Sequence, residues 1–119
     1  MSPAQRHQRR DLIAGLRTLA AFLDSHSQVP VPRYRTVRVS VHTLYDTDAT
    51  TEAEAIAEVG RVAALLGVTP TIQRGHHVAC ATFGAVCYEA LHVTHAAMAR
   101  IQALDSYRDA ITLDETEGA

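Results

Sequence analysis

Metal-ligating and nucleophilic side chains gather in one stretch of this chain, HHVACATFGAVCYEALHV, which runs from position 76 to position 93. It contains His76, His77, Cys80, Cys87 and His92. Imidazole and thiolate are preferred ligands of zinc, and a thiolate beside an oriented base is a nucleophile. Metal or thiol chemistry, if the protein performs any, is therefore expected in this stretch.

The alternation of side chains around Gly84-Ala85 predicts a β-hairpin with a two-residue turn, in which glycine takes the first central position. Residue 83 then pairs with residue 86, and His77 lies directly opposite His92. One face carries His77, Ala79, Ala81, Phe83, Val86, Tyr88, Ala90 and His92, and the other carries His76, Val78, Cys80, Thr82, Cys87, Glu89, Leu91 and Val93. The thiols and the opposed imidazoles are thus predicted on different faces.

This separation argues against a zinc centre with four ligands, because one register cannot gather both cysteines and the opposed histidines. Two smaller ligand sets stay open. One is His76 with the two cysteines, and the other is His77, His92 and His95, if the following helix folds His95 back. No cofactor is assigned. Both cysteines are expected to be free thiols that pack as small apolar side chains, because no secretory signal precedes them.

The sequence contains few groups of side chains that could act together in catalysis. Either thiol beside Glu89 and His76 is the one local arrangement that could activate a nucleophile, and no cysteine-protease or nucleophile-elbow signature surrounds it. Asp46 and Asp48 could bind a hard cation, but they more simply form a turn before a helix. The six glycines are scattered, so no phosphate-binding loop is present. No catalytic residue is assigned, and the sequence favours a protein that is not an enzyme.

Hydrophobic periodicity predicts the elements that would position these residues. The expected order is a helix after Ser2-Pro3, a strand within 36–45, a helix from Thr51 to Gly67, a short strand within 68–73, the two hairpin strands, and a helix after Thr94. This order, α-β-α-β-β-β-α, predicts an α+β fold with a sheet of about four largely antiparallel strands and two or three helices packed on one face. The apolar stripes of the first and last helices are expected to face the core.

Length and composition predict a single α+β domain over residues 1–119, because a chain of 12.9 kDa with 47% hydrophobic residues can bury a core. Basic residues crowd the first turn, so the N-terminus is expected to fray over about 1–8, with the firm helix starting near Asp11. An acidic tail over about 112–119 is expected to be mobile. No run reaches the length of a membrane span, which predicts a cytoplasmic protein with no membrane partner.

Positive charge is concentrated near the N-terminus. Residues 1–45 hold seven of the eleven arginines and only two carboxylates, whereas the remainder is acidic. A nucleic-acid surface would use Arg6, Arg9, Arg10, Arg33, Arg35 and Arg38. The formal net charge of −2 and the absence of a helix-turn-helix pattern argue against this use. Protein binding is favoured instead, either through the arginine-rich N-terminal helix or through the open sheet face that carries Arg38, Ser40, His42 and Glu89.

Three stretches, DLIAGLRTLAAFLDSHSQVPVP, GHHVACATFGAVCYEALHV and MARIQALDSY, together resemble a group of small uncharacterised proteins encoded by GC-rich actinobacteria and by their phages and mobile elements. The resemblance covers most of the chain. It implies a cytoplasmic setting, associated with a phage or mobile element, and it implies no activity.

The sequence therefore predicts a small non-enzymatic module or accessory factor that binds another macromolecule. A protein partner or a second copy of the chain, giving a homodimer, is favoured, and no small-molecule substrate is indicated. A nucleic-acid-associated regulator that uses the arginine-rich N-terminal region is the alternative. A metal- or thiol-dependent enzyme comes third.

Overall fold

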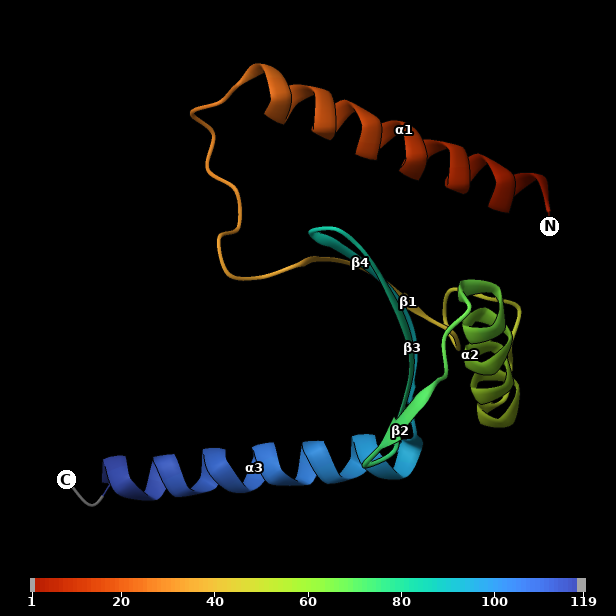
Figure 1. Ribbon diagram of the computed structural model, residues 1–119. Coiled ribbons are helices and arrows are strands. Elements are labelled where there is room, and N and C mark those ends of the chain that lie inside the picture. The colour runs from red at the N-terminus through yellow and green to blue at the C-terminus, as the bar shows by residue number, and fades with distance from the viewer. Residues whose placement is uncertain (1, 118–119) are drawn as a thin grey trace. The chain divides into compact units, whose positions relative to one another are not determined.

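The computed structural model describes the backbone of residues 2–117 and the side chains of residues 2–107 (Figure 1). The elements are α1 (Pro3–Ser25), β1 (Val37–His42), α2 (Glu52–Leu66), β2 (Thr71–Gln73), β3 (His76–Phe83), β4 (Val86–Val93) and α3 (His95–Glu117). The predicted α+β class and the predicted order of elements are confirmed. The chain forms two compact units, Met1–Tyr34 and Arg35–Ala119, and each is described by itself.

The first unit is built on α1, which has a complete capping box. The Ser2 hydroxyl accepts the Gln5 N–H, and the Gln5 side chain accepts the Ser2 N–H at 2.8 Å. Pro3 follows at the first helical position, where a backbone N–H would have no partner within the helix, so the missing N–H of proline costs no hydrogen bond. The helix begins at Pro3, where the capping box satisfies free N–H groups and so opposes the unfavourable basic side chains of the first turn. Fraying over about 1–8 stays a prediction.

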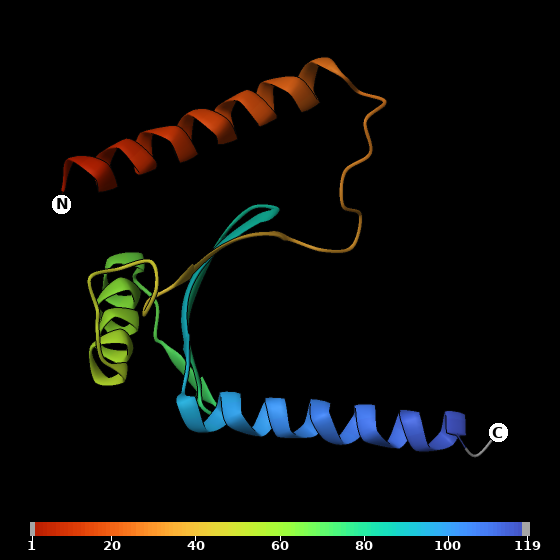
Figure 2. The same ribbon diagram turned by 180° about the vertical axis from the view of Figure 1, so that it is seen from behind.

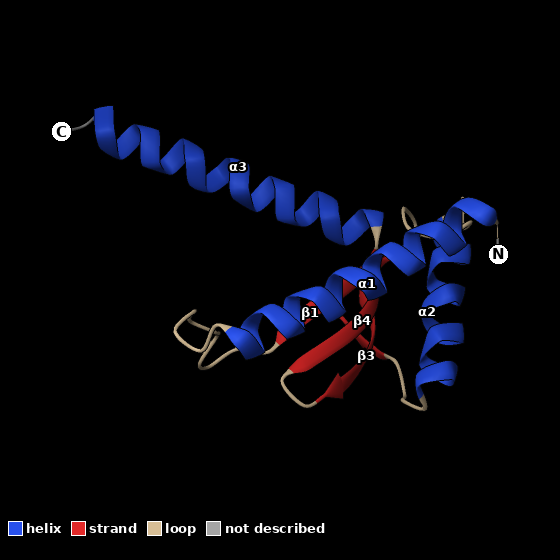
Figure 3. Ribbon diagram, turned by 90° about the horizontal axis from the view of Figure 1, so that it is seen from above, coloured by secondary structure: helices blue, strands red, loops and turns tan. Residues whose placement is uncertain are grey.

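The second unit contains a four-stranded sheet in the order β1-β4-β3-β2. Figure 3 labels β1, β4 and β3 among its red strands. The β1–β4 pair is parallel and the other two pairs are antiparallel. Phe83 pairs with Val86 and His77 with His92, so the predicted hairpin register is confirmed. Gly84 has φ +65° and Ala85 is not in the positive region, as a turn with glycine in the first central position requires.

Helix α2 covers one face of the sheet (Figures 1 and 2). The Thr51 hydroxyl caps its start and Gly67, at φ +71°, ends it in the left-handed conformation. Val59 and Ala63 are buried against Ala79 of β3. Alanines on both sides of this contact let the helix approach the sheet closely, which yields a small core of tightly packed short side chains.

Helix α3 is anchored at its first turn. Arg74 and Gly75, at φ 54° and 78°, form the two-residue turn between β2 and β3. The Thr94 N–H donates to the Gly75 carbonyl at 2.9 Å, and Ala97 is buried beside this turn. From there α3 runs to Glu117, through the region that the sequence predicted to be a mobile tail from about residue 112. The last two residues of that tail lie outside the described part.

Candidate functional site

Three of the four residues predicted to bind protein form one hydrogen-bonded cluster on the sheet face opposite α2. Parallel pairing places Ser40 of β1 beside Glu89 of β4. The Ser40 hydroxyl donates to Glu89 Oε1 at 2.8 Å, and the Arg38 guanidinium donates to Glu89 Oε2 at 3.2 Å. The Arg38 side chain is 61% exposed and that of Glu89 only 13%. The cluster therefore presents a guanidinium outward over a shielded carboxylate.

His42, the fourth predicted residue, lies on the same face at the end of β1. Its backbone N–H donates to the Asp46 carboxylate at 2.8 Å. Its carbonyl accepts the N–H groups of Tyr45 and Asp46 at 3.0 and 2.8 Å. Asp46 thus forms part of the turn that ends the strand, which is the simpler of the two roles that the sequence left open.

Cys80 and Cys87 are joined by a disulfide, so the expectation of two free thiols is wrong. Cys80 pairs with Glu89 and Cys87 with Thr82, which makes the cysteines diagonal neighbours on one face, with Cα atoms 6.8 Å apart. That separation lies within the range a disulfide spans. Free thiols were expected because the cytosol is reducing. The hairpin register nevertheless brings the two diagonal cysteines close enough for a disulfide. A thiol nucleophile or thiolate ligand would first require reduction of this bond.

A buried histidine forms the second polar cluster. His92 is 5% exposed, and its Nε2 lies 3.0 Å from Glu52 Oε1. The same carboxylate oxygen accepts the His95 N–H at 2.7 Å. The hydrogen bond to His92 and then that to His95 hold the pKa of Glu52 below its ordinary value of 4.5. This contact joins the start of α2 to the start of α3.

Glu52 was missed as a site residue because its partners are 40 and 43 positions away along the chain. The sequence marks it only as an acidic residue in the first turn of a capped helix, where the helix dipole suffices to explain it. Its second role depends on the strand register, which brings His92 to the face that α2 covers.

The predicted metal ligands are brought together only in part. His77 is paired opposite His92, and the His92 and His95 rings meet edge to face with centroids 6.3 Å apart. Yet His92 Nε2 already contacts Glu52, and among the described residues no group of three or more histidine, cysteine or acidic side chains could hold a metal ion. The other ligand set, His76 with the two cysteines, has both sulfurs in the disulfide. A metal site at either set remains a prediction.

The predicted nucleic-acid residues are divided between the two units. Arg6, Arg9 and Arg10 are exposed on the first turns of α1, and Arg33 lies in the segment that follows that helix. Arg35 and Arg38 belong to the second unit, where Arg38 is paired with Glu89. Within one unit, the structure therefore groups only the three arginines at the start of α1.

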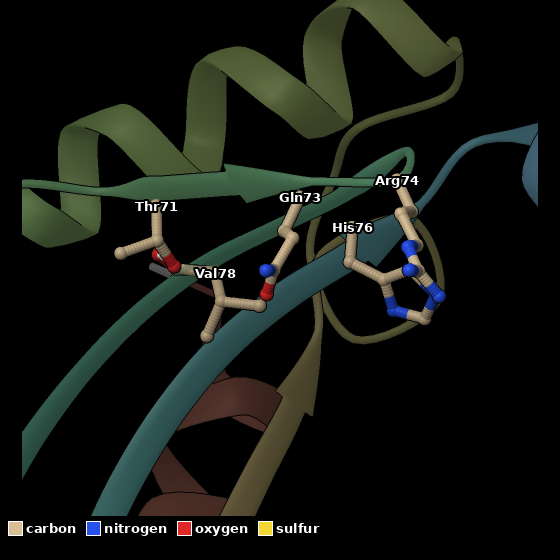
Figure 4. Close-up of a pocket in the computed structure, with 5 residues that line it drawn as sticks. All are labelled: Thr71, Gln73, Arg74, His76 and Val78. Carbon is tan, nitrogen blue, oxygen red and sulfur yellow. Dashed lines mark hydrogen bonds between the residues drawn. The ribbon is translucent and has the colours of Figure 1, made fainter.

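A hollow beside the β2–β3 hairpin is lined by Thr71, Gln73, Arg74, His76 and Val78 (Figure 4). Strand pairing places four of them on one face, because Thr71 is opposite Val78 and Gln73 opposite His76. The lining offers one guanidinium, one imidazole and no carboxylate or thiol. It therefore lacks an acid–base pair, and we assign no reaction to it.

An apolar row of leucines lies along α1, and we define this leucine seam as Leu12, Leu16, Leu19 and Leu23. The first three are 50%, 44% and 52% exposed, and none of the helix's residues is buried. Met98, Ile101, Leu104 and Tyr107 of α3 are exposed as well. The stripe of α3, which belongs to the same unit as the core, therefore does not face the core as expected. Within the first unit nothing buries the stripe of α1.

No protein-family description matches this sequence, and neither the curated proteins nor the solved structures include a match to it. Within the described residues, none of the helices combines the length and the apolar character that crossing a membrane requires.

Proposed function

We propose that the protein is a small non-enzymatic module that binds another protein through the leucine seam of α1. The observation that carries this proposal is an N-capped helix of 23 residues whose leucines recur at one face, with Leu12, Leu16 and Leu19 exposed. Contiguous apolar surface of this kind marks interaction sites in soluble proteins. The absence of a convergent reactive set among the described residues supports a binding role over catalysis.

The seam also indicates the chemistry of the partner. Its leucines are spaced by four, three and four residues, the spacing at which an amphipathic helix lies in an apolar groove. Five arginines and only two aspartates lie within residues 1–34. The expected partner therefore presents an apolar groove with carboxylates along its rim, on another protein or on a second copy of this chain.

Site-specific photo-crosslinking tests the proposal. A photoreactive residue at Leu19 should crosslink to one protein species in cells, whereas the same residue at Ala21, on the opposite side of the helix, should not. The purified partner should then bind the wild-type chain and the Ala21→Asp variant, and bind Leu19→Asp at least about tenfold more weakly, because a buried carboxylate would be unpaired. Equal crosslinking from both positions would refute the seam as a docking site.

Nucleic-acid binding is the second candidate, favoured by the exposed Arg6, Arg9 and Arg10 and by the absence of acidic residues in the first turn of α1. If these three arginines contact phosphates, the logarithm of the binding constant for duplex DNA should fall with the logarithm of salt concentration with a slope of about −2.7. Binding that is unchanged by replacing all three with alanine would exclude this surface.

Two further proposals, on the cellular setting and on an enzymatic activity, rest on the amino-acid sequence alone. A cytoplasmic protein associated with a phage or mobile element is proposed on the resemblance alone, and the neighbouring genes would test it. A metal- or thiol-dependent enzyme is the third candidate. Metal analysis of the purified protein and thiol titration before and after reduction would decide it.

A further inference from the structure

The outer edge of β1 carries an inference that goes beyond the proposed docking of α1. Strand β1 is the last strand on its side of the sheet. The Val37 N–H donates to the Ala85 carbonyl and the Thr43 N–H to the Leu91 carbonyl, each at 3.0 Å. Peptide groups alternate in direction along a strand, so odd-numbered residues bond to β4 and even-numbered ones direct their N–H and C=O groups outward.

The outward edge is closed at one end. The His42 N–H binds the Asp46 carboxylate, and the His42 carbonyl accepts two N–H groups of the following turn. Arg38 and Ser40 are then the two residues of β1 whose outward peptide groups face away from both β4 and this turn. The strand VRVSVH contains no proline and has high β-propensity. Edges of this kind readily pair with another strand.

We propose that β1 pairs antiparallel with β1 of a second copy, with Val39 of one copy opposite Val39 of the other. Directly opposed residues of an antiparallel pair lie on the same face of the sheet. A two-fold axis perpendicular to the sheet must therefore pass between the two copies of one residue, so that this residue lies opposite its own counterpart. Centring the axis on Val39 pairs Arg38 with Ser40 and lets these residues form four backbone hydrogen bonds. Centring it on Ser40 would require His42, whose N–H and carbonyl are already bonded within its own chain.

The side chains are self-complementary in the same register. On the α2 face, Val37 of one copy meets Val41 of the other. Val37 belongs to an exposed apolar row that continues through Val86 and Phe83, and the contact extends this row into the partner's sheet. On the opposite face, Arg38 of one copy lies beside Ser40 of the other, whose hydroxyl binds the shielded Glu89 carboxylate. This matching of apolar with apolar side chains on one face, and of the exposed Arg38 with the polar Ser40 on the other, is why a second copy is the occupant.

Sedimentation equilibrium with two variants at Ser40 tests the pairing. The wild-type chain should approach twice 12.9 kDa as concentration rises. Ser40→Pro removes an outward N–H from each copy at a position where an edge strand tolerates proline, so the dimer should be about 30-fold weaker. Ser40→Ala removes the contact with Glu89 but keeps the N–H, and should still dimerise. A wild-type protein that stays at 12.9 kDa at all concentrations would overturn the proposal.

Cysteine crosslinking reads the register directly and does not depend on the proline variant folding. Val39→Cys should form a covalent dimer on mild oxidation, because each new thiol faces its own counterpart across the axis. Val41→Cys, on the same face, should not. Crosslinking of Ser40→Cys alone, or none at Val39, would refute the register. A dimer that persists in Leu19→Asp but weakens in Ser40→Pro would separate this interface from the α1 seam.

Discussion

A single carboxylate, Glu52, holds three elements of the second unit together. It begins α2, its Oε1 contacts the His92 ring of β4, and the same oxygen accepts the first N–H of α3. Charge-assisted hydrogen bonds of this kind are stronger than neutral ones. The cluster is therefore best understood as a structural junction, although its residue types would also suit catalysis.

Protonation of Glu52 is expected to weaken this junction. Because its folded-state pKa lies below the ordinary value, the carboxylate stabilises the fold above about pH 4.5, and this contribution is lost as pH falls through the folded-state pKa. We expect Glu52→Gln to lower the free energy of unfolding at pH 7 and to differ progressively less from wild type in more acidic buffer. Urea unfolding across pH 3 to 7 measures this.

Glu54→Gln is the matched control, because Glu54 lies in the same first turn of α2 but accepts a hydrogen bond from the Thr50 N–H instead. Both variants remove one negative charge near the helix N-terminus, so their shared effect reports the dipole. A Glu52 variant with the same pH profile as the Glu54 variant would show that the contacts with His92 and His95 add nothing.

The attachment of α3 to the β2–β3 turn depends on a missing side chain at Gly75. A Cβ added there would lie 2.6 Å from both Ala97 Cβ and Thr94 Oγ1, and φ is +78°. We expect Gly75→Ala to destabilise the protein by about 2–5 kcal/mol, by combining the backbone penalty with displacement of the first turn of α3. Chemical denaturation measures the loss.

Gly84→Ala separates the two contributions. Gly84 also has a positive φ, at +65°, but a Cβ added at this residue would meet nothing within 4 Å. This variant should lose only the penalty of a strained backbone conformation, about 1–3 kcal/mol. Equal losses at the two glycines would mean that α3 does not press against the turn.

The hairpin was the most predictable element. A glycine-first turn and alternating side chains set its register, and the register correctly opposed His77 to His92 and sent the cysteines to the other face. The disulfide was not predicted, because a reducing cytosol was expected to keep both thiols free, although the register places Cys80 and Cys87 diagonally across the hairpin. Thr51 and Gly67 likewise marked both ends of α2 correctly, since caps are local signals.

Features that depend on distant residues could not be predicted. Parallel pairing of β1 with β4, and hence the meeting of Arg38 and Ser40 with Glu89, joins residues about 50 positions apart. Periodicity identifies an apolar stripe but does not say what covers it. The stripe of α3 was therefore expected to be buried, whereas the structure exposes it.

The two units of the chain are stabilised by different means. Residues 35–119 contain a sheet, a covering helix and a buried core centred on Val59. Residues 1–34 contain one helix with no buried residue, so its local stability comes from its caps and its intrinsic propensity. A helix stabilised in this way opens easily, and a module that docks through it would gain order on binding.

Hydrogen exchange measured along the whole chain distinguishes these regimes. Amides of β3 and β4 should open only with the core and be protected roughly 10³-fold or more, whereas amides of α1 should be protected no more than about 100-fold. Addition of a partner that docks on the leucine seam should slow exchange in α1 and leave β3 unchanged, because docking removes local opening of the helix alone. Protection of α1 equal to that of β4 in the isolated protein would show that the seam is already covered, and the proposed binding surface would then be wrong.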